Sequence, residues 1–298
     1  MNTVPLPNAA NGTTWTIQDL APPVGALITG LDTSRPLQAD QIMALKKALH
    51  ERHLLLLRGQ QINDEQLLRL ANYFGSIYRP PAGEQVLGLD PFSGDMPDIV
   101  RVSNVEGGTL GRHALAAHTD HHWTAIPSSG SLAYAVEIPR AGGDTTFYNL
   151  VAVYEALDDA TKREIEGLRL ITYNPFLRHR KPLSSRKIPR YRTPDIEPLS
   201  PCENHPLVRT HPESGRKLLY LSADTEVELM DTDPVWGAAL IERLRAHMLQ
   251  PRFAYIHHWQ VGDIIYWDNQ ATAHARTAFD SAERRVLKRV SFGGSRPF

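Results

Sequence analysis

Apolar residues recur at helical spacing in four segments of this chain. In residues 40–52, Ile42, Leu45 and Leu49 fall on one stripe, and charged residues occupy the other faces. The same spacing predicts three further helices, at residues 64–73, 150–167 and 231–248. Because such a stripe buries one face of a helix, we expect all four helices to pack against a core.

Short runs rich in leucine, isoleucine, valine and aromatic residues lie between these segments and predict strands. The runs occupy residues 54–57, 99–102, 131–138, 168–173, 217–221, 253–259, 263–267 and 285–292. Such strands, with helices mostly outside them, predict a mainly β fold with flanking helices and a double-stranded β-helix (jelly-roll) core. A site would then lie in the mouth between the two facing sheets.

The chain shows no internal repeat and no low-complexity linker. We therefore expect residues 1–298 to form a single jelly-roll domain. Two stretches, residues 80–98 and 174–204, have no regular pattern and are rich in proline. Loops of this length often cover binding sites, so we expect them to form lids or inserts.

Composition excludes several classes of protein. A formal net charge of −1 gives no reason to expect nucleic acid or an anionic membrane as a partner. No stretch approaches the 18 apolar residues of a membrane span. Cys202 is the one cysteine, so no internal disulfide can form, and the first residues do not resemble a secretion signal. We expect a cytoplasmic protein.

The candidate chemistry begins with His118 and Asp120, which flank Thr119, and with the distant His274. Two imidazoles and one carboxylate on one face of a metal leave other coordination positions open, which suits non-haem Fe(II) and dioxygen. The chain has 13 histidines, so a His-x-Asp pair also arises by chance. The pair gains weight only from the residues that follow.

Two arginines follow His274, at Arg285 and Arg289, in a segment that is expected to be a strand. Side chains four apart on a strand share a face, so both are expected to point into the cavity that holds the metal. An arginine presents a planar fork that matches a carboxylate, which makes it a natural anchor for an acidic co-substrate. The alternative is a solvated basic strand.

Further motifs accompany these residues along most of the chain. They are GALITGLD at 25–32, LLLLRG at 54–59, GGDTT at 142–146, HPLV at 205–208 with His211-Pro212, and Gly262-Asp263 before Trp267-Asp268-Asn269. Together with the residues above, in this order and spacing, they resemble the taurine dioxygenase (TauD/TfdA) family. Members of that family are Fe(II)- and 2-oxoglutarate-dependent dioxygenases, and relatives commonly form dimers or tetramers.

The resemblance implies a role for each matching residue. The iron ligands would be His118, Asp120 and His274. Arg285 and Thr145 would hold the distal carboxylate of 2-oxoglutarate. Three residues would contact the prime substrate, and these are Arg289, Asn104 and Trp123. Ala117 departs from the tryptophan that often precedes the first ligand, and residues 87–101 contain no histidine to match the one that helps to bind taurine.

The expected reaction is hydroxylation of a C–H bond in a small anionic molecule, such as a sulfonate, sulfate ester, carboxylate or amino acid. Succinate and CO2 would be released, and O2 consumed. Desaturation or another oxidative step with the same cofactors stays open. A zinc hydrolase that uses two histidines and an aspartate, or a jelly-roll protein without catalysis, is the further alternative. We expect His211, His257 and His258 to be surface or strand residues.

Overall fold

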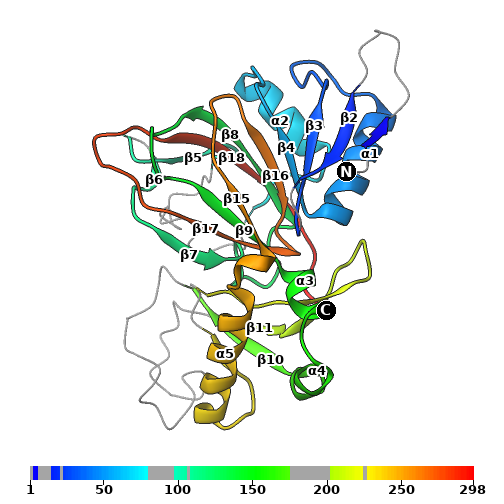
Figure 1. Cartoon of the computed structure of the whole chain (residues 1–298), viewed down its shortest axis with the longest axis vertical. Helices are drawn as coiled ribbons and strands as arrows, with labels where there is room; N and C mark the ends of the chain where they lie inside the picture. Colours follow the sequence, from blue (N-terminus) through cyan, green and yellow to red (C-terminus); the bar gives the residue numbers. More distant parts are fainter. Residues whose placement is uncertain are drawn as a thin grey trace.

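Two facing β-sheets form the upper part of the molecule (Figure 1). The structure, a computed structural model, describes residues 3–5, 15–20, 23–79, 97–105, 108–174, 202–223 and 227–298. Within these residues the larger sheet has the order β1 (Thr3–Pro5), β2 (Thr16–Asp19), β3 (Ala26–Thr29), β4 (Leu54–Leu57), β16 (Ile264–Asp268), β8 (Gly130–Glu137), β18 (Val286–Phe292), β5 (Val100–Ser103) and β6 (Thr109–Leu110). The smaller sheet has the order β15 (Ala254–His257), β9 (Thr145–Asn149), β17 (Thr272–Arg276) and β7 (Leu115–His118).

An apolar layer fills the space between the two sheets. It includes Ala133 and Leu287 from the larger sheet and Phe147 from the smaller one. Two sheets that bury their facing sides in this way form the predicted jelly-roll core, and solved structures similar to this chain belong to the same type of fold. The core leaves a hollow in which a site can lie.

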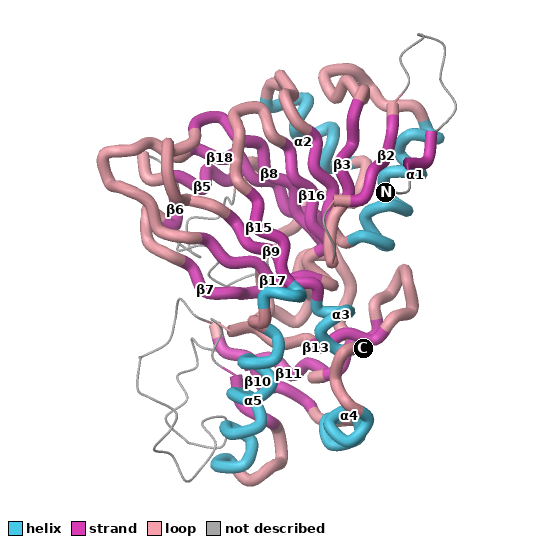
Figure 2. The backbone as a smooth tube through the Cα atoms, in the orientation of Figure 1, coloured by secondary structure: helices cyan, strands magenta, loops and turns pink. Residues whose placement is uncertain are grey.

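Two helices cover the outer face of the larger sheet, α1 (Ala39–Arg52) and α2 (Asp64–Asn72) (Figure 2). The apolar stripe of α1 buries Leu45 and Leu49 in one cluster with Leu55 and Leu57 of β4. Asn63 caps α2, since its side chain accepts a hydrogen bond from the Gln66 N–H. Both helices begin and end within one residue of the predicted segments.

A second group of elements lies below the sheets (Figure 1). It contains the three-stranded sheet β11 (Cys202–Pro206), β10 (Arg169–Tyr173) and β14 (Val227–Leu229), and the pair β12 (Val208–Thr210) and β13 (Lys217–Leu219). Its helices are α3 (Leu150–Glu155), α4 (Asp159–Ile165), α5 (Pro234–Met248) and the 3₁₀ helix η3 (Pro251–Phe253). Helix α5 starts three residues after the beginning of the predicted segment, with Asp233 as its cap and Pro234 in its first turn.

All eight predicted strands are present, and three of the four predicted helices are continuous. The fourth segment, residues 150–167, forms two helices. Helix α3 ends at Glu155, and Asp158 begins α4 as its N-cap, since its side chain accepts a hydrogen bond from the Thr161 N–H. The two expected loops lie mostly outside the described residues. No helix among the described residues is long and apolar enough to cross a membrane.

Candidate metal centre

The three predicted ligands come together at one edge of the smaller sheet. Strands β7 and β17 pair so that His118 stands opposite His274, with their ring centroids 4.3 Å apart. Asp120 follows β7, and its two carboxylate oxygens lie 3.8 Å from His118 Nε2 and 3.9 Å from His274 Nε2. One atom from each side chain lies within 4.8 Å of the others, so the group can hold a metal ion.

The electrostatics of this group favour a cation. Burial alone would raise the pKa of Asp120, but the charge of Arg289 and the neighbouring His274 hold it well below its ordinary value. Burial lowers the pKa of His274 to about 3, and His118 contributes to this effect. His118 Nδ1 lies 2.8 Å from the Ala116 carbonyl, which can only accept, so its Nε2 keeps a lone pair. At neutral pH the site therefore offers the carboxylate of Asp120 and the neutral imidazole of His274.

A narrow pocket, partly open to solvent, adjoins these residues and lies between the two sheets. Its apolar wall consists of Val102, Leu110, Leu115, Phe147, Trp267 and Leu287. His118 and His274 line the same pocket, together with three arginines, Arg276, Arg285 and Arg289. A small apolar chamber with a few convergent charged groups is the usual form of a small-molecule site.

Arg285 lies deep in this pocket, with only 2% of its surface exposed. Its Nε donates to the Gly143 carbonyl at 3.1 Å, whereas its buried Nη1 has no hydrogen-bond partner among the described residues. A Cβ on Gly143 would lie 3.0 Å from the side chain of Arg285, and the backbone at Gly143 has a φ of +70°. Both the close contact and the backbone conformation therefore favour glycine at this position. Burial lowers the pKa of Arg285 to about 9, and Arg276 adds to this. The guanidinium group is therefore suited to an anionic ligand.

Thr145 is placed beside the arginines. Its Oγ1 accepts a hydrogen bond from Trp259 Nε1 at 2.9 Å, which leaves its own hydroxyl proton to donate. Arg276 lies opposite Thr145 in the pairing of β9 with β17. Thr145 and Arg285 thus line one pocket, and the prediction that they hold one carboxylate stays a prediction.

Comparison with known proteins decides the family. Residues 16–291 match the family described as Taurine catabolism dioxygenase TauD, TfdA family. The chain belongs to this family.

Individual relatives agree over almost the whole chain. The alpha-ketoglutarate-dependent 2,4-dichlorophenoxyacetate dioxygenase of Cupriavidus pinatubonensis is 29% identical, covering 91% of this chain and 95% of the relative. The alpha-ketoglutarate-dependent sulfate ester dioxygenase of Pseudomonas putida is 25% identical, covering 100% and 95%. A crystal structure of AAD-2 in complex with Mn(II) and N-oxalylglycine has a TM-score of 0.76 at 28% identity, covering 95% and 99%.

This member of the TauD/TfdA family is an Fe(II)- and 2-oxoglutarate-dependent dioxygenase, which confirms the predicted enzyme class and cofactors. The residues present fit these groups. Two histidines and an aspartate form a donor set that suits iron. The unpaired Nη1 of Arg285 suits the distal carboxylate of the keto acid.

Arg289 of this dioxygenase lines the pocket and also forms an ion pair with Asp120. Its Nη1 donates to both oxygens of Asp120 at 3.1 Å. Its Nε and Nη2 are buried and have no hydrogen-bond partner within the residues that the structure describes. Sequence reasoning anticipated only a substrate contact for Arg289. The bond to Asp120 could not be anticipated, because the two residues are 169 positions apart.

The two other predicted substrate residues lie near the site but do not line the pocket. Asn104 accepts from the Arg285 N–H at 2.9 Å and donates to the Glu283 carbonyl at 2.8 Å. These bonds fix the backbone from which Arg285 projects. Trp123 is buried in the apolar layer between the sheets. A substrate contact by either residue stays a prediction.

Sequence reasoning missed Arg276 and the contact between Asn269 and Asp120. Arg276 is two positions after His274 on β17, so alternation along the strand would have placed both side chains on one face. Asn269 accepts from the Asp120 N–H and donates to the Asp120 carbonyl, both at 2.9 Å. This contact joins two residues that are 149 positions apart, so the pattern of neighbouring residues in the sequence does not indicate it.

The expectation for His211 was wrong. It is fully buried rather than a surface residue, and although it follows β12 it does not belong to the strand. Its Nε2 lies 2.8 Å from Asp268. His257 lies on β15 as predicted, and the side chain of His258 is 76% exposed.

Proposed function

We propose that His118, Asp120 and His274 bind the Fe(II) of this dioxygenase, and that the enzyme oxidises a C–H bond of a small anionic molecule. The observation that supports this most directly is the arrangement of the pocket. His118 and His274 line the same pocket as the buried guanidinium groups of Arg276 and Arg285, which have no acidic partner within 4 Å among the described residues. A dicarboxylate that reaches from the metal to Arg285 would neutralise charge that the protein leaves uncompensated.

Bound iron, with 2-oxoglutarate and O2, supplies the oxidant for a C–H bond, and the keto acid leaves as succinate and CO2. The chain's own residues bind and orient. Arg285 and Thr145 hold the distal carboxylate of 2-oxoglutarate, and Asn104 fixes the backbone of Arg285. The apolar wall excludes water from the reacting groups, which strengthens the electrostatic contacts inside the pocket. Hydroxylation is the proposed outcome.

The prime substrate in this proposal is an anion with an apolar body. The free Nε and Nη2 of Arg289 provide donors for a carboxylate, sulfonate or sulfate group next to the metal. Val102, Leu110 and Leu287 offer apolar contact for the rest of the molecule. Relatives named for a phenoxyacetate and for sulfate esters support this substrate class.

An anaerobic titration of the metal-free protein tests the function. Adding Fe(II) and then 2-oxoglutarate is expected to give the visible charge-transfer band of an iron–keto acid chelate. Carboxylates and sulfate esters with an aryl or alkyl body are then expected to shift this band, whereas neutral analogues of the same shape are not. Iron binding without the band would overturn the assignment of the keto acid site.

Arg276→Met is expected to weaken 2-oxoglutarate binding. The guanidinium of Arg276 is buried beside Thr145, and its Nε and Nη1 have no partner in the described part of the chain. A hydrogen bond to a charged group contributes about 1.5–3 kcal/mol, so the Kd should rise roughly 10- to 100-fold. Anaerobic titration of the chelate band measures it. An unchanged Kd would limit Arg276 to its bonds with the Leu110 and His113 carbonyls.

We further propose that the chain forms one domain, works in the cytoplasm and assembles as a homo-oligomer, a dimer or tetramer. The family match across residues 16–291 supports the single domain. The single cysteine suits a reducing compartment.

Exposed Val235 and Trp236 at the start of α5 offer apolar surface for a subunit contact. Light scattering coupled to size-exclusion chromatography tests the assembly.

A further inference from the structure

The turn between β16 and β17 contacts Asp120 and leads into the strand that contains His274. The side chain of Asn269, which lies in this turn, accepts a hydrogen bond from the Asp120 N–H and donates one to the Asp120 carbonyl. Thr272, the first residue of β17, donates from its hydroxyl to the Asp268 carbonyl at 2.7 Å, and β17 continues to His274. The position of this turn therefore sets where Asp120 and His274 lie.

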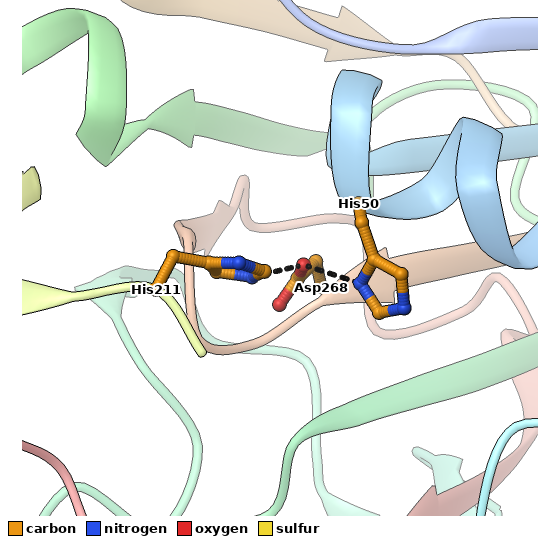
Figure 3. Close-up of side chains that lie close together, drawn as sticks. All are labelled: His50, His211 and Asp268. Carbon is orange, nitrogen blue, oxygen red and sulfur yellow. Dashed lines mark hydrogen bonds and ion pairs between the residues drawn. The ribbon is translucent and has the colours of Figure 1, made fainter. Parts of the chain in front are cut away.

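A cluster of histidines surrounds the carboxylate of Asp268, which ends β16 (Figure 3). We call His50, His53, His211 and Asp268 the Asp268 cluster. His211 Nε2 lies 2.8 Å from Asp268 Oδ2, and the nitrogens of His50 and His53 lie at 3.7 and 3.9 Å. The Gln270 N–H donates to the other oxygen at 3.0 Å. The carboxylate thus joins α1 and the segment after β12 to the turn.

Two histidines and an aspartate can hold a metal, but the hydrogen bonds of His211 favour another role. The Ser214 N–H donates to His211 Nδ1 at 3.1 Å, so Nδ1 is the acceptor and the ring proton is on Nε2. That proton points at Asp268, and 2.8 Å is the length of a hydrogen bond. His211 is therefore a donor to Asp268 rather than a ligand.

The charge of Asp268 depends on these donors. Asp268 is 1% exposed, and burial opposes its ionisation, yet the hydrogen bond from His211 and the nearby imidazoles of His50 and His53 hold its pKa well below the ordinary value. Burial also opposes protonation of His50, but Asp268 and Glu213 outweigh burial and the charge of Lys46, and they raise its pKa. Removing a donor leaves a buried carboxylate undersatisfied, which is costly.

We propose that His211 and Asp268 are positioning residues of the metal centre, which act through the turn at Asn269 and the start of β17. The inference rests on the proposed ligand set of His118, Asp120 and His274. Neither His211 nor Asp268 touches the proposed metal position. Asp268 accepts from the Gln270 N–H of the turn, and His211 donates to Asp268, as partners behind a metal ligand commonly do.

Co(II) binding to the metal-free protein tests this without turnover. His211→Ala is expected to weaken Co(II) affinity roughly 10- to 100-fold and to alter the visible Co(II) spectrum, since partners behind metal ligands have effects of this size. His211→Gln can place an amide N–H near the position of Nε2 and is expected to restore most of the affinity. His211→Asn is too short to reach Asp268 and is expected to behave like alanine, which keeps the test valid if the alanine variant does not fold.

A matched control separates positioning from general loss of stability. Leu70→Ala truncates a buried side chain of α2 and is expected to lower Tm, but α2 packs on β18 and β8, and Leu70 belongs to a different apolar cluster from Ala271 of the turn. It is expected to leave Co(II) affinity and spectrum unchanged. Wild-type affinity in folded His211→Ala and His211→Asn would overturn the positioning role while leaving the proposed function intact.

Two further results have distinct meanings. In the first, the double variant His118→Ala, Asp120→Ala still binds one equivalent of Zn(II), and adding His50→Ala abolishes this binding. The Asp268 cluster would then itself be a metal site, and the proposal would be overturned. Failure of the wild-type protein to bind Co(II) or Fe(II) at all would overturn the proposed function, and the positioning role with it.

Discussion

Asp120→Ala is expected to abolish Fe(II) binding and turnover, and also to lower the free energy of unfolding of the metal-free protein. The first effect follows from the loss of the carboxylate in the donor set. The second follows because Arg289 is buried, with 4% of its surface exposed, and would lose the carboxylate to which its Nη1 donates two hydrogen bonds. Breaking one partner out of a buried ion pair costs about 3–5 kcal/mol. Metal analysis and urea unfolding measure the two effects separately.

The double variant Asp120→Ala, Arg289→Met separates these two roles. Removing the cation together with the anion is expected to recover most of the lost stability, because no unpaired buried charge is left. Turnover is expected to stay absent. Arg289→Met alone should weaken both metal and substrate binding, since Arg289 bonds Asp120 and faces the pocket. Turnover at the wild-type rate in Asp120→Ala would refute the proposed ligand set.

Arg285→Ala is expected to raise the Kd for 2-oxoglutarate strongly and to leave Fe(II) binding in place. Truncating one partner of a buried charged hydrogen bond costs about 2–5 kcal/mol, which is roughly 30-fold to several-thousand-fold in Kd. Arg285 suits this role because its buried Nη1 has no protein partner among the described residues, and Thr145 lines the same pocket. Anaerobic titration of the chelate band gives the Kd directly.

Arg284→Ala is the matched control. Arg284 is the preceding residue, but its side chain is 62% exposed and pairs with Glu137 on the surface. Its removal is expected to change the 2-oxoglutarate Kd by less than twofold, because exposed ion pairs contribute little. Equal effects at Arg284 and Arg285 would mean that the arginines act through net charge rather than through a contact.

The regular elements with strong local patterns were predictable. Helix α1 has its apolar stripe at three-and-four spacing, and β4 is four consecutive leucines, so neighbouring residues alone determine them. Among the strands that the sequence did not reveal are β7, β9 and β17, which contain His118, Thr145 and His274 respectively. They are short and rich in alanine, threonine and polar residues. They become strands by pairing with one another, which no local window shows.

By itself, the sequence determined the chemistry that the protein can perform, because ligand types and their spacing mark the metal site, and the motifs mark the family. Tertiary structure alone decided which charges meet. Arg289 joins Asp120, and Asp268 joins His211, across 169 and 57 positions. The physical reason is that a buried ion or imidazole must find its partner within about 3 Å in space, whatever the separation along the chain.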